Sequence, residues 1–316
     1  MQFVNEQTIK YPKKGLIFQD VKETDNILGG IKGLEWTRVN VGGHWRDYQP
    51  VSELQRNSLG DVYGCVSFSN NSSHEFIHKK QYGEEINMSD RYLVVGSGTV
   101  PYQGNYKLTV AQWKQKNYWV DEKDWPYGPK MSVEEYYNNG KVPPELLEKG
   151  KQKTNLYQIN FQYLKDNSVK SLKDGLEFSP VQVDVQNYSF NSKGYIQNIK
   201  GDYIHEVIIF DYEEGECWWV FDSENEQYIK FDWNYKFTTP MIHYLKKKFM
   251  PKLYKVNGQP AIYFLNPEDG RLVPFSDGKI AGGSLFKIFF GDYSNVSIIK
   301  VDKLPYPVAD YSIRTF

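Results

Sequence analysis

An α+β fold in two lobes is the class that this sequence predicts. Segments with helical signals lie between residues 64 and 151, and the alternating or continuous apolar runs typical of strands come after Pro180. Helices followed by strands are expected to form separate lobes. The chain has 316 residues, of which 40% are hydrophobic, so it can bury one large core or two modest ones.

The helical part begins after a lead-in. Residues 1–44 are mixed and glycine-punctuated, and they read as an extended N-terminal lead-in that is short for an inhibitory propeptide. A helix is predicted from Gly64 through about Gln81, because Gly83 supplies a C-terminal stop. Further helical or turn segments are expected over residues 88–95, 108–117 and 142–151.

The strand signals follow. Residues 181–185 alternate strictly, which predicts a half-buried strand. Two apolar runs, residues 207–210 and 217–221, flank a charged turn and predict a β-hairpin. Residues 239–316 are read as a mostly β appendage that could contact a protein partner, because the tight-turn signals Asn257-Gly258, Asp269-Gly270 and Asp277-Gly278 fall within them.

Composition excludes several classes of protein. Lys and Arg number 38 against 39 Asp and Glu, so we expect neither a nucleic-acid partner nor a membrane surface, both of which select clustered basic residues. No signal-peptide pattern and no apolar run of about 20 residues is present, which predicts a soluble protein. Only Cys65 and Cys217 occur, so a reducing compartment is favoured, either the cytoplasm or a particle assembled there. No cofactor and no metal are expected.

Four residues carry the chemistry that we expect. His205 follows Cys65 by 140 residues, Asp222 comes 17 residues later, and Gln55 precedes the cysteine. A histidine about 130–150 residues after the cysteine is typical of papain-like thiol hydrolases. Cys65 would be the nucleophile, with its thiolate favoured by a helix N-terminus and an imidazolium. His205 would carry the proton, Asp222 would orient the imidazole, and Gln55 would donate to the oxyanion.

The chain resembles the papain family of cysteine peptidases over roughly residues 44–238. The resemblance is carried by short elements in a shared order: His44-Trp45-Arg46 with Pro50-Val51 and Gln55; Cys65-Val66-Ser67-Phe68-Ser69 with Glu75; Asn87-Met88-Ser89; Trp125-Pro126-Tyr127; Leu172-Lys173-Asp174-Gly175-Leu176 with Ser179-Pro180-Val181; His205-Glu206-Val207; and Phe221-Asp222-Ser223. It implies a papain-like peptidase domain over residues 45–238, with a helical lobe at 45–176 and a β-barrel-like lobe at 177–238. It also implies a peptide or protein substrate in a cleft between the lobes, with a loop around Gly104 lining it.

The sequence departs from the family pattern at several places. Gln55 lies ten residues before Cys65, so the oxyanion loop would carry an insertion. Asp222 stands where the family usually has Asn, which adds a negative charge that raises histidine basicity. Ser223-Glu224 replaces a shielding tryptophan, so Asp222 is expected to be more open to water. The sequence resembles divergent papain-like proteins encoded by bacteriophages.

Three other functions stay open at this point. A papain-like domain could be retained as an inactive scaffold or virion component, since a propeptide is missing and an appendage is present. The motif His74-Glu75-Phe76-Ile77-His78 fits the pattern of a zinc metallopeptidase. A cell-wall peptide hydrolase with a Cys-His pair would usually place its histidine much closer to the cysteine. Cys217, beside two tryptophans, is expected to lie in the core.

Overall fold

The computed structural model describes residues 15–17, 37–51, 54–186, 188–198, 204–224, 227–248, 253–257, 262–265, 272–275 and 298–303. The chain divides into two compact units, residues 1–247 and 248–316, so residue 239, the expected start of the appendage, lies inside the first unit. The division falls later because strand β10, Thr238–Lys247, pairs with two strands of the first unit along its length.

The first unit combines a group of helices with one large sheet. The helices are α1 (Cys65–Tyr82), α2 (Asp90–Gly96), α3 (Lys107–Asn117), α4 (Val133–Tyr137), α5 (Pro144–Gln152) and α6 (Val169–Leu176). The sheet has eight strands in the order β3-β10-β4-β7-β8-β9-β6-β5. Their bounds are β3 (Tyr157–Tyr163), β4 (Val181–Gln186), β5 (Tyr188–Phe190), β6 (Ile196–Asn198), β7 (Ile204–Glu213), β8 (Cys217–Asp222), β9 (Gln227–Asp232) and β10.

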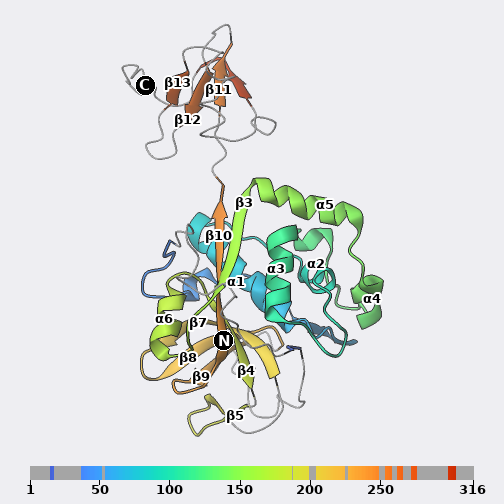
Figure 1. The fold of residues 1–316 in the computed structure, drawn as a ribbon, viewed down its shortest axis with the longest axis vertical. Helices are drawn as coiled ribbons and strands as arrows, with labels where there is room; N and C mark the ends of the chain where they lie inside the picture. The colour runs from blue at the N-terminus through green and yellow to red at the C-terminus, as the bar shows by residue number, and fades with distance from the viewer. Residues whose placement is uncertain are drawn as a thin grey trace. The chain divides into compact units, whose positions relative to one another are not determined.

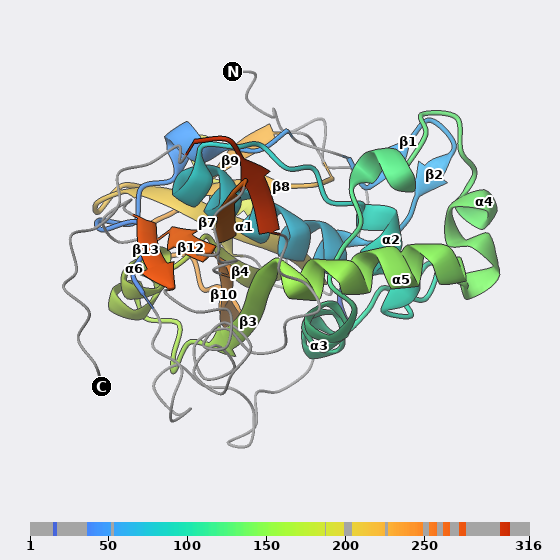
Figure 2. The same ribbon diagram turned by 90° about the horizontal axis from the view of Figure 1, so that it is seen from above.

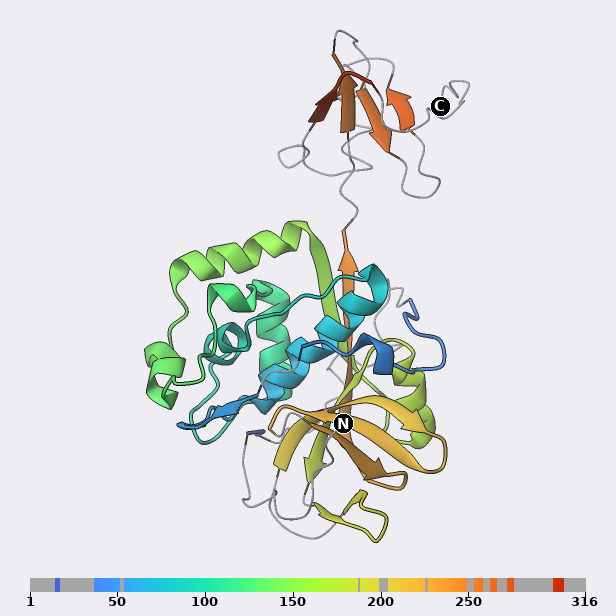
Figure 3. The ribbon, with the colours of Figure 1, turned by 180° about the vertical axis from the view of Figure 1, so that it is seen from behind.

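Helix α1 lies between helices α2 to α5 and the sheet (Figures 1 and 3). Figure 2 shows α2 to α5 gathered on one side of α1 and strands β7 to β9 on the other. Fourteen residues of α1 are buried, although many are polar and poor helix formers. Tertiary packing from both sides therefore holds this helix. Its predicted end is confirmed, because Gly83 caps it in the left-handed conformation at φ 67°.

Both faces of strand β4 are buried, so the prediction of a half-buried strand was wrong. Val181, Val183 and Val185 enter the main apolar core. The polar residues between them, Gln182 and Asp184, are buried as well, because they face the helical side and find partners there. Alternation in the sequence thus separated an apolar face from a buried polar face.

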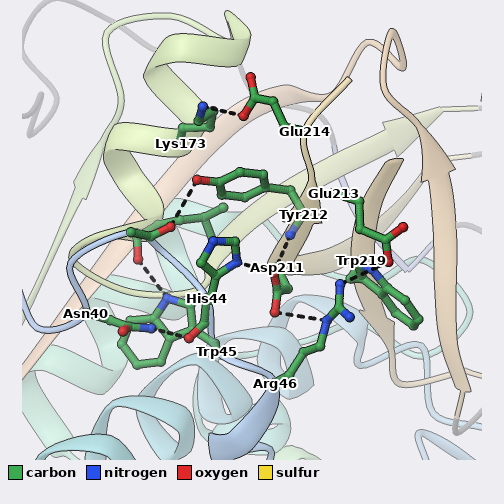
Figure 4. Close-up of polar contacts among 12 residues, drawn as sticks. Asn40, His44, Trp45, Arg46, Lys173, Asp211, Tyr212, Glu213, Glu214 and Trp219 are labelled. Carbon is green, nitrogen blue, oxygen red and sulfur yellow. Dashed lines mark hydrogen bonds and ion pairs between the residues drawn. The ribbon is translucent and has the colours of Figure 1, made fainter. Parts of the chain in front are cut away.

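Residues 44–46 are bound to β7 and to the end of α6 by a polar network (Figure 4). The buried Asp211 carboxylate accepts from His44 Nδ1 at 2.7 Å and from Arg46 Nε at 3.0 Å. Between them, the fully buried Trp45 donates its indole N–H to the carbonyl of Leu176 at 2.7 Å. These contacts hold residues 44–46 against β7 and α6.

The second unit contains a four-stranded sheet in the order β13-β12-β11-β14. Its strands are β11 (Leu253–Val256), β12 (Ile262–Leu265), β13 (Leu272–Phe275) and β14 (Ile298–Val301). Asn257 follows β11 as a turn residue. The predicted turn positions Gly258, Asp269-Gly270 and Asp277-Gly278 lie outside the described residues.

Candidate active site

Cys65 is the first residue of α1, and its side chain is completely buried. Gly64 caps the helix, and a larger residue would not fit there, because a Cβ would lie 2.8 Å from Val94 and 3.1 Å from the ring of Phe68. The sulfur therefore sits at the positive end of the helix dipole, which favours a thiolate.

His205 and Asp222 come together through the hairpin of β7 and β8. His205 is the second residue of β7 and Asp222 the last of β8, and His205 Nε2 lies 2.7 Å from Asp222 Oδ1. The Cys65 thiol hydrogen-bonds to the same imidazole. Three residues chosen from the sequence thus form one connected chain of side chains.

Charges within this trio shift both titrating groups. Burial by itself lowers the pKa of His205, but the Asp222 carboxylate and the Cys65 sulfur outweigh it and leave that pKa well above its ordinary value. Burial raises the pKa of the Cys65 thiol, and the nearby His205 offsets part of the rise. The carboxylate therefore favours the protonated imidazole, whereas burial works against ionisation of the thiol.

Asp222 is shielded from water, contrary to the expectation from the residues that follow it. Only 2% of its side chain is exposed. The backbone N–H of Glu224 donates to Asp222 Oδ1 at 2.8 Å, and Arg56 Nη2 forms an ion pair with Glu224 at 3.3 Å. Glu224 and Arg56 thus lie beside Asp222, which is shielded from water without the tryptophan that the family commonly has there. Burial raises the pKa of Glu224 to about 7, with the charge of Asp222 adding to the rise.

Gln55 lies beside this trio with its amide held at both ends. Its Oε1 accepts from Ser223 Oγ at 2.9 Å, and its Nε2 donates to Asp61 Oδ1 at 3.2 Å. The longer gap before Cys65 forms the hairpin of β1 (Arg56–Asn57) and β2 (Gly60–Asp61). The structure brings Gln55 next to Ser223, the residue after Asp222, but the Gln55 amide N–H donates to the carboxyl group of Asp61. Asp61 was not foreseen, and no pattern in the sequence singles it out.

The N-terminal segment covers the sulfur. A Cβ on Gly15 would lie 2.6 Å from Cys65 Sγ, so the glycine backbone is packed directly on the thiol. Leu16 is 4% exposed and packs with Cys65, Val66, Leu93 and Val110. The expectation of a lead-in over residues 1–44 did not include this contact. The signal in the sequence was slight: one glycine followed by Leu16 and Ile17 in a polar stretch.

Backbone hydrogen bonds hold the covering segment to the loop around Gly104. Leu16 forms a parallel bridge with Asn105, and Ile17 N donates to the Asn105 carbonyl at 2.9 Å. Gly104 has φ 91°, and a Cβ there would lie 2.0 Å from the Gly15 carbonyl oxygen. Gly104 therefore makes room for the backbone of Gly15, the residue that packs on Cys65.

The His-Glu-x-x-His motif does not present a shared set of metal ligands. His74 Nδ1 lies 2.8 Å from the Asn70 carbonyl, while His78 contacts the Glu84 carbonyl at 3.0 Å and the Tyr157 hydroxyl at 3.1 Å. Glu75 accepts from the backbone N–H of Met88. Among the residues that the structure describes, no three His, Cys, Asp or Glu side chains gather as metal ligands. Cys217 is buried in the main core, as expected.

No protein-family model and no curated protein matches the chain. Solved structures do. Xylellain, a cysteine protease from Xylella fastidiosa, matches with a TM-score of 0.52 and 15% identity, over 76% of this chain and 98% of that one. The clostridial cysteine protease Cwp84 matches with a TM-score of 0.51 and 16% identity, over 69% of this chain and 61% of that one. The chain therefore has the papain-like cysteine protease fold, the α+β two-lobed fold that the sequence resemblance implied.

Proposed function

We propose that this protein is a papain-like cysteine peptidase that hydrolyses peptide bonds in a peptide or protein substrate. The observation that supports it best is the linked trio of Cys65, His205 and Asp222 at a helix N-terminus. An inert buried cysteine would not need a hydrogen-bonded imidazole that is itself held by a buried carboxylate.

The proposed reaction proceeds in two stages through an acyl-enzyme. The Cys65 thiolate attacks the amide carbon, and His205 gives its proton to the nitrogen as the C–N bond breaks. Water then attacks the thioester carbon while His205 takes its proton, and the C–S bond breaks. Asp222 holds the imidazole throughout. The Cys65 backbone N–H and the Gln55 amide would receive the oxyanion, and one such donor is worth about 3–4 kcal/mol of barrier.

The described state is a closed form of this site. Gly15 occupies the space over the sulfur that a substrate carbonyl would need. Leu16, anchored in the adjacent apolar cluster, holds the segment in place. Turnover therefore requires the segment to leave. The scaffold alternative keeps one specific observation in its favour, because a thiol sealed by the chain's own backbone would be unreactive.

Alkylation of the thiol separates these functions. We expect an epoxide that alkylates thiolates to label Leu16→Asp, in which a charge is placed in the apolar cluster, much faster than the unchanged chain. Labelling should be lost in the Leu16→Asp background on adding Cys65→Ala and greatly slowed by His205→Ala. Cys217→Ser is the matched control, since it removes the other buried thiol and should leave labelling unchanged.

The rival functions give different outcomes in the same experiment. An opened and folded protein whose Cys65 is never labelled would support the scaffold. Peptidase activity lost on adding a chelator, and lost in His74→Ala, would support the zinc enzyme.

We propose that residues 45–247 form the peptidase domain and that residues 248–316 are an appended module for a protein partner. Relatedness to bacteriophage proteins and a place in the cytoplasm or a virion stay predictions; among the described residues, no helix is both long and apolar enough to cross a bilayer.

A further inference from the structure

A buried charged cluster lies on the opposite face of β7 from the imidazole. Glu206 directly follows His205, so its side chain leaves the strand on the other face. There it meets Lys107, the first residue of α3, with Nζ 2.9 Å from Glu206 Oε1 and 2.5 Å from Asp184 Oδ1. The Lys107 side chain is 4% exposed, and those of Asp184 and Glu206 are 2% and 0% exposed.

Lys107 is held from β10 as well. Its ammonium donates to the Thr239 carbonyl at 2.7 Å and to the Thr239 hydroxyl at 3.1 Å, in addition to its ion pairs with the two acidic side chains. Thr239 lies on β10 and presents this carbonyl from a left-handed conformation with φ 42°. Asp184, Glu206 and Thr239 belong to the three adjacent strands β4, β7 and β10. One side chain at the start of α3 therefore connects a helix to the centre of the sheet.

The same residue of β7 is also held by the nucleophile helix. Ser69 Oγ, one turn along α1 from Cys65, donates to the Glu206 carbonyl at 3.2 Å. Glu206 is thus held through its backbone by α1 and through its side chain by α3. Both contacts act one residue away from His205, where a small shift of the strand would change the approach of the imidazole to the sulfur.

We infer that Lys107, acting through Glu206, is a positioning residue that sets the approach of His205 to Cys65. This inference rests on the proposed peptidase function. Isolated buried charges are costly, and a lysine with two carboxylates in the interior is retained here next to a catalytic pair. Apolar residues of similar volume could fill the same space. Charged and hydrogen-bonding groups, unlike apolar packing, also fix the orientation of Glu206 and so the position of β7.

The protonation of the cluster makes the proposal testable with a conservative variant. Burial raises the pKa of Glu206 well above its ordinary value, and the charge of Asp184 adds to the rise. Burial therefore favours the protonated form of Glu206, whose Oε1 lies 2.9 Å from Lys107 Nζ. Glutamine has the same shape and the same arrangement of one donor and one acceptor. Glu206→Gln should keep the contact between this side chain and Lys107, whereas Glu206→Ala should remove it.

The test compares alkylation of Cys65 by iodoacetamide across pH, in the full chain carrying Leu16→Asp. We expect Lys107→Met to slow alkylation near neutral pH by about 10²-fold, the loss typical of a small misplacement of reacting groups. Its residual reactivity should follow a simple thiol titration at higher pH, because the imidazolium no longer assists. Glu206→Ala should behave like Lys107→Met, and Glu206→Gln should stay within about tenfold of the parent.

Lys114→Met is the matched control. Lys114 lies two turns further along α3, is equally buried at 1% exposure, and contacts Asn71 and Met88 instead of the catalytic strand. Equal alkylation profiles for Lys107→Met and Lys114→Met would overturn the inference. If Lys107→Met fails to fold, equal profiles for Glu206→Ala and Glu206→Gln would overturn it as well. A parent protein never alkylated at Cys65 would instead refute the peptidase function.

Discussion

The carboxylate of Asp222 gives the proposed catalytic histidine its unusual basicity. It lies 2.7 Å from His205 in a buried site, where charge interactions are weakly screened. An asparagine would hold the ring equally well through its oxygen but would contribute no charge. Orientation and basicity can therefore be separated by substitution at this one position.

We expect Asp222→Asn, in the Leu16→Asp background, to keep Cys65 reactivity within about tenfold at neutral pH while lowering the pKa of His205. Because the imidazolium then loses its proton at lower pH, the alkaline end of the pH profile should move down. Asp222→Ala should cost about 10²-fold or more, since nothing then orients the ring. Alkylation rates measured against pH check both. An unchanged profile in Asp222→Asn would show that the carboxylate carries no charge.

Glu224 makes the fold sensitive to pH. Burial raises its pKa to about 7, so the folded chain holds this proton more tightly than the unfolded chain does. A raised folded pKa contributes stability at low pH that is lost as pH rises from the ordinary value through about 7. We expect Glu224→Gln, which stays neutral, to reduce the stability lost between about pH 4 and pH 8 by ~1–3 kcal/mol. Denaturant unfolding at several pH values measures it, and parallel losses in both proteins would contradict it.

At the scale of elements, the N-terminal segment decides whether the site is open. Gly15 packs on Cys65 Sγ at a distance that excludes any side chain. The same contact removes water from the thiol, and burial is the largest cause of its raised pKa. Covering the sulfur therefore both blocks a substrate and suppresses the thiolate.

We expect Gly15→Ala to displace the segment and to increase the rate of Cys65 alkylation, with the midpoint of its pH dependence moving to lower pH. The cause is steric, since the added methyl would lie 2.6 Å from the sulfur. Gly128→Ala is the control, because its methyl would meet only Met131 at 4.0 Å. Rates that match between the two variants would mean that the segment does not limit access to the thiol.

At the scale of the whole molecule, the first unit contains all eight strands of its own sheet. Its last strand, β10, is paired with β3 through Lys247, the last residue of that unit. We expect a chain ending at residue 247 to keep the unfolding temperature and the Cys65 labelling of the full-length protein. Differential scanning calorimetry with alkylation tests this, and a large fall in the unfolding temperature would show that residues 248–316 support the fold.

Local pattern determined much of this protein from sequence alone. The helix that begins near Cys65, its end at Gly83 and the β7–β8 hairpin follow from short-range signals such as capping, turns and apolar runs. The order of Cys65, His205 and Asp222 is read directly from the sequence. Strand β3 was missed inside a polar, tyrosine-rich stretch, because its pairing with β10 joins residues about 80 positions apart.

Only the tertiary structure decided which buried polar groups meet. Nothing local indicates that Gly15 covers Cys65, that Asp61 holds Gln55, or that Lys107 reaches Glu206. Each of these contacts joins distant or unpatterned residues, and each depends on removing charges or a thiol from water. Periodicity reports which face of an element is buried, whereas the partner that makes a buried charge tolerable is set by the packing of separate elements.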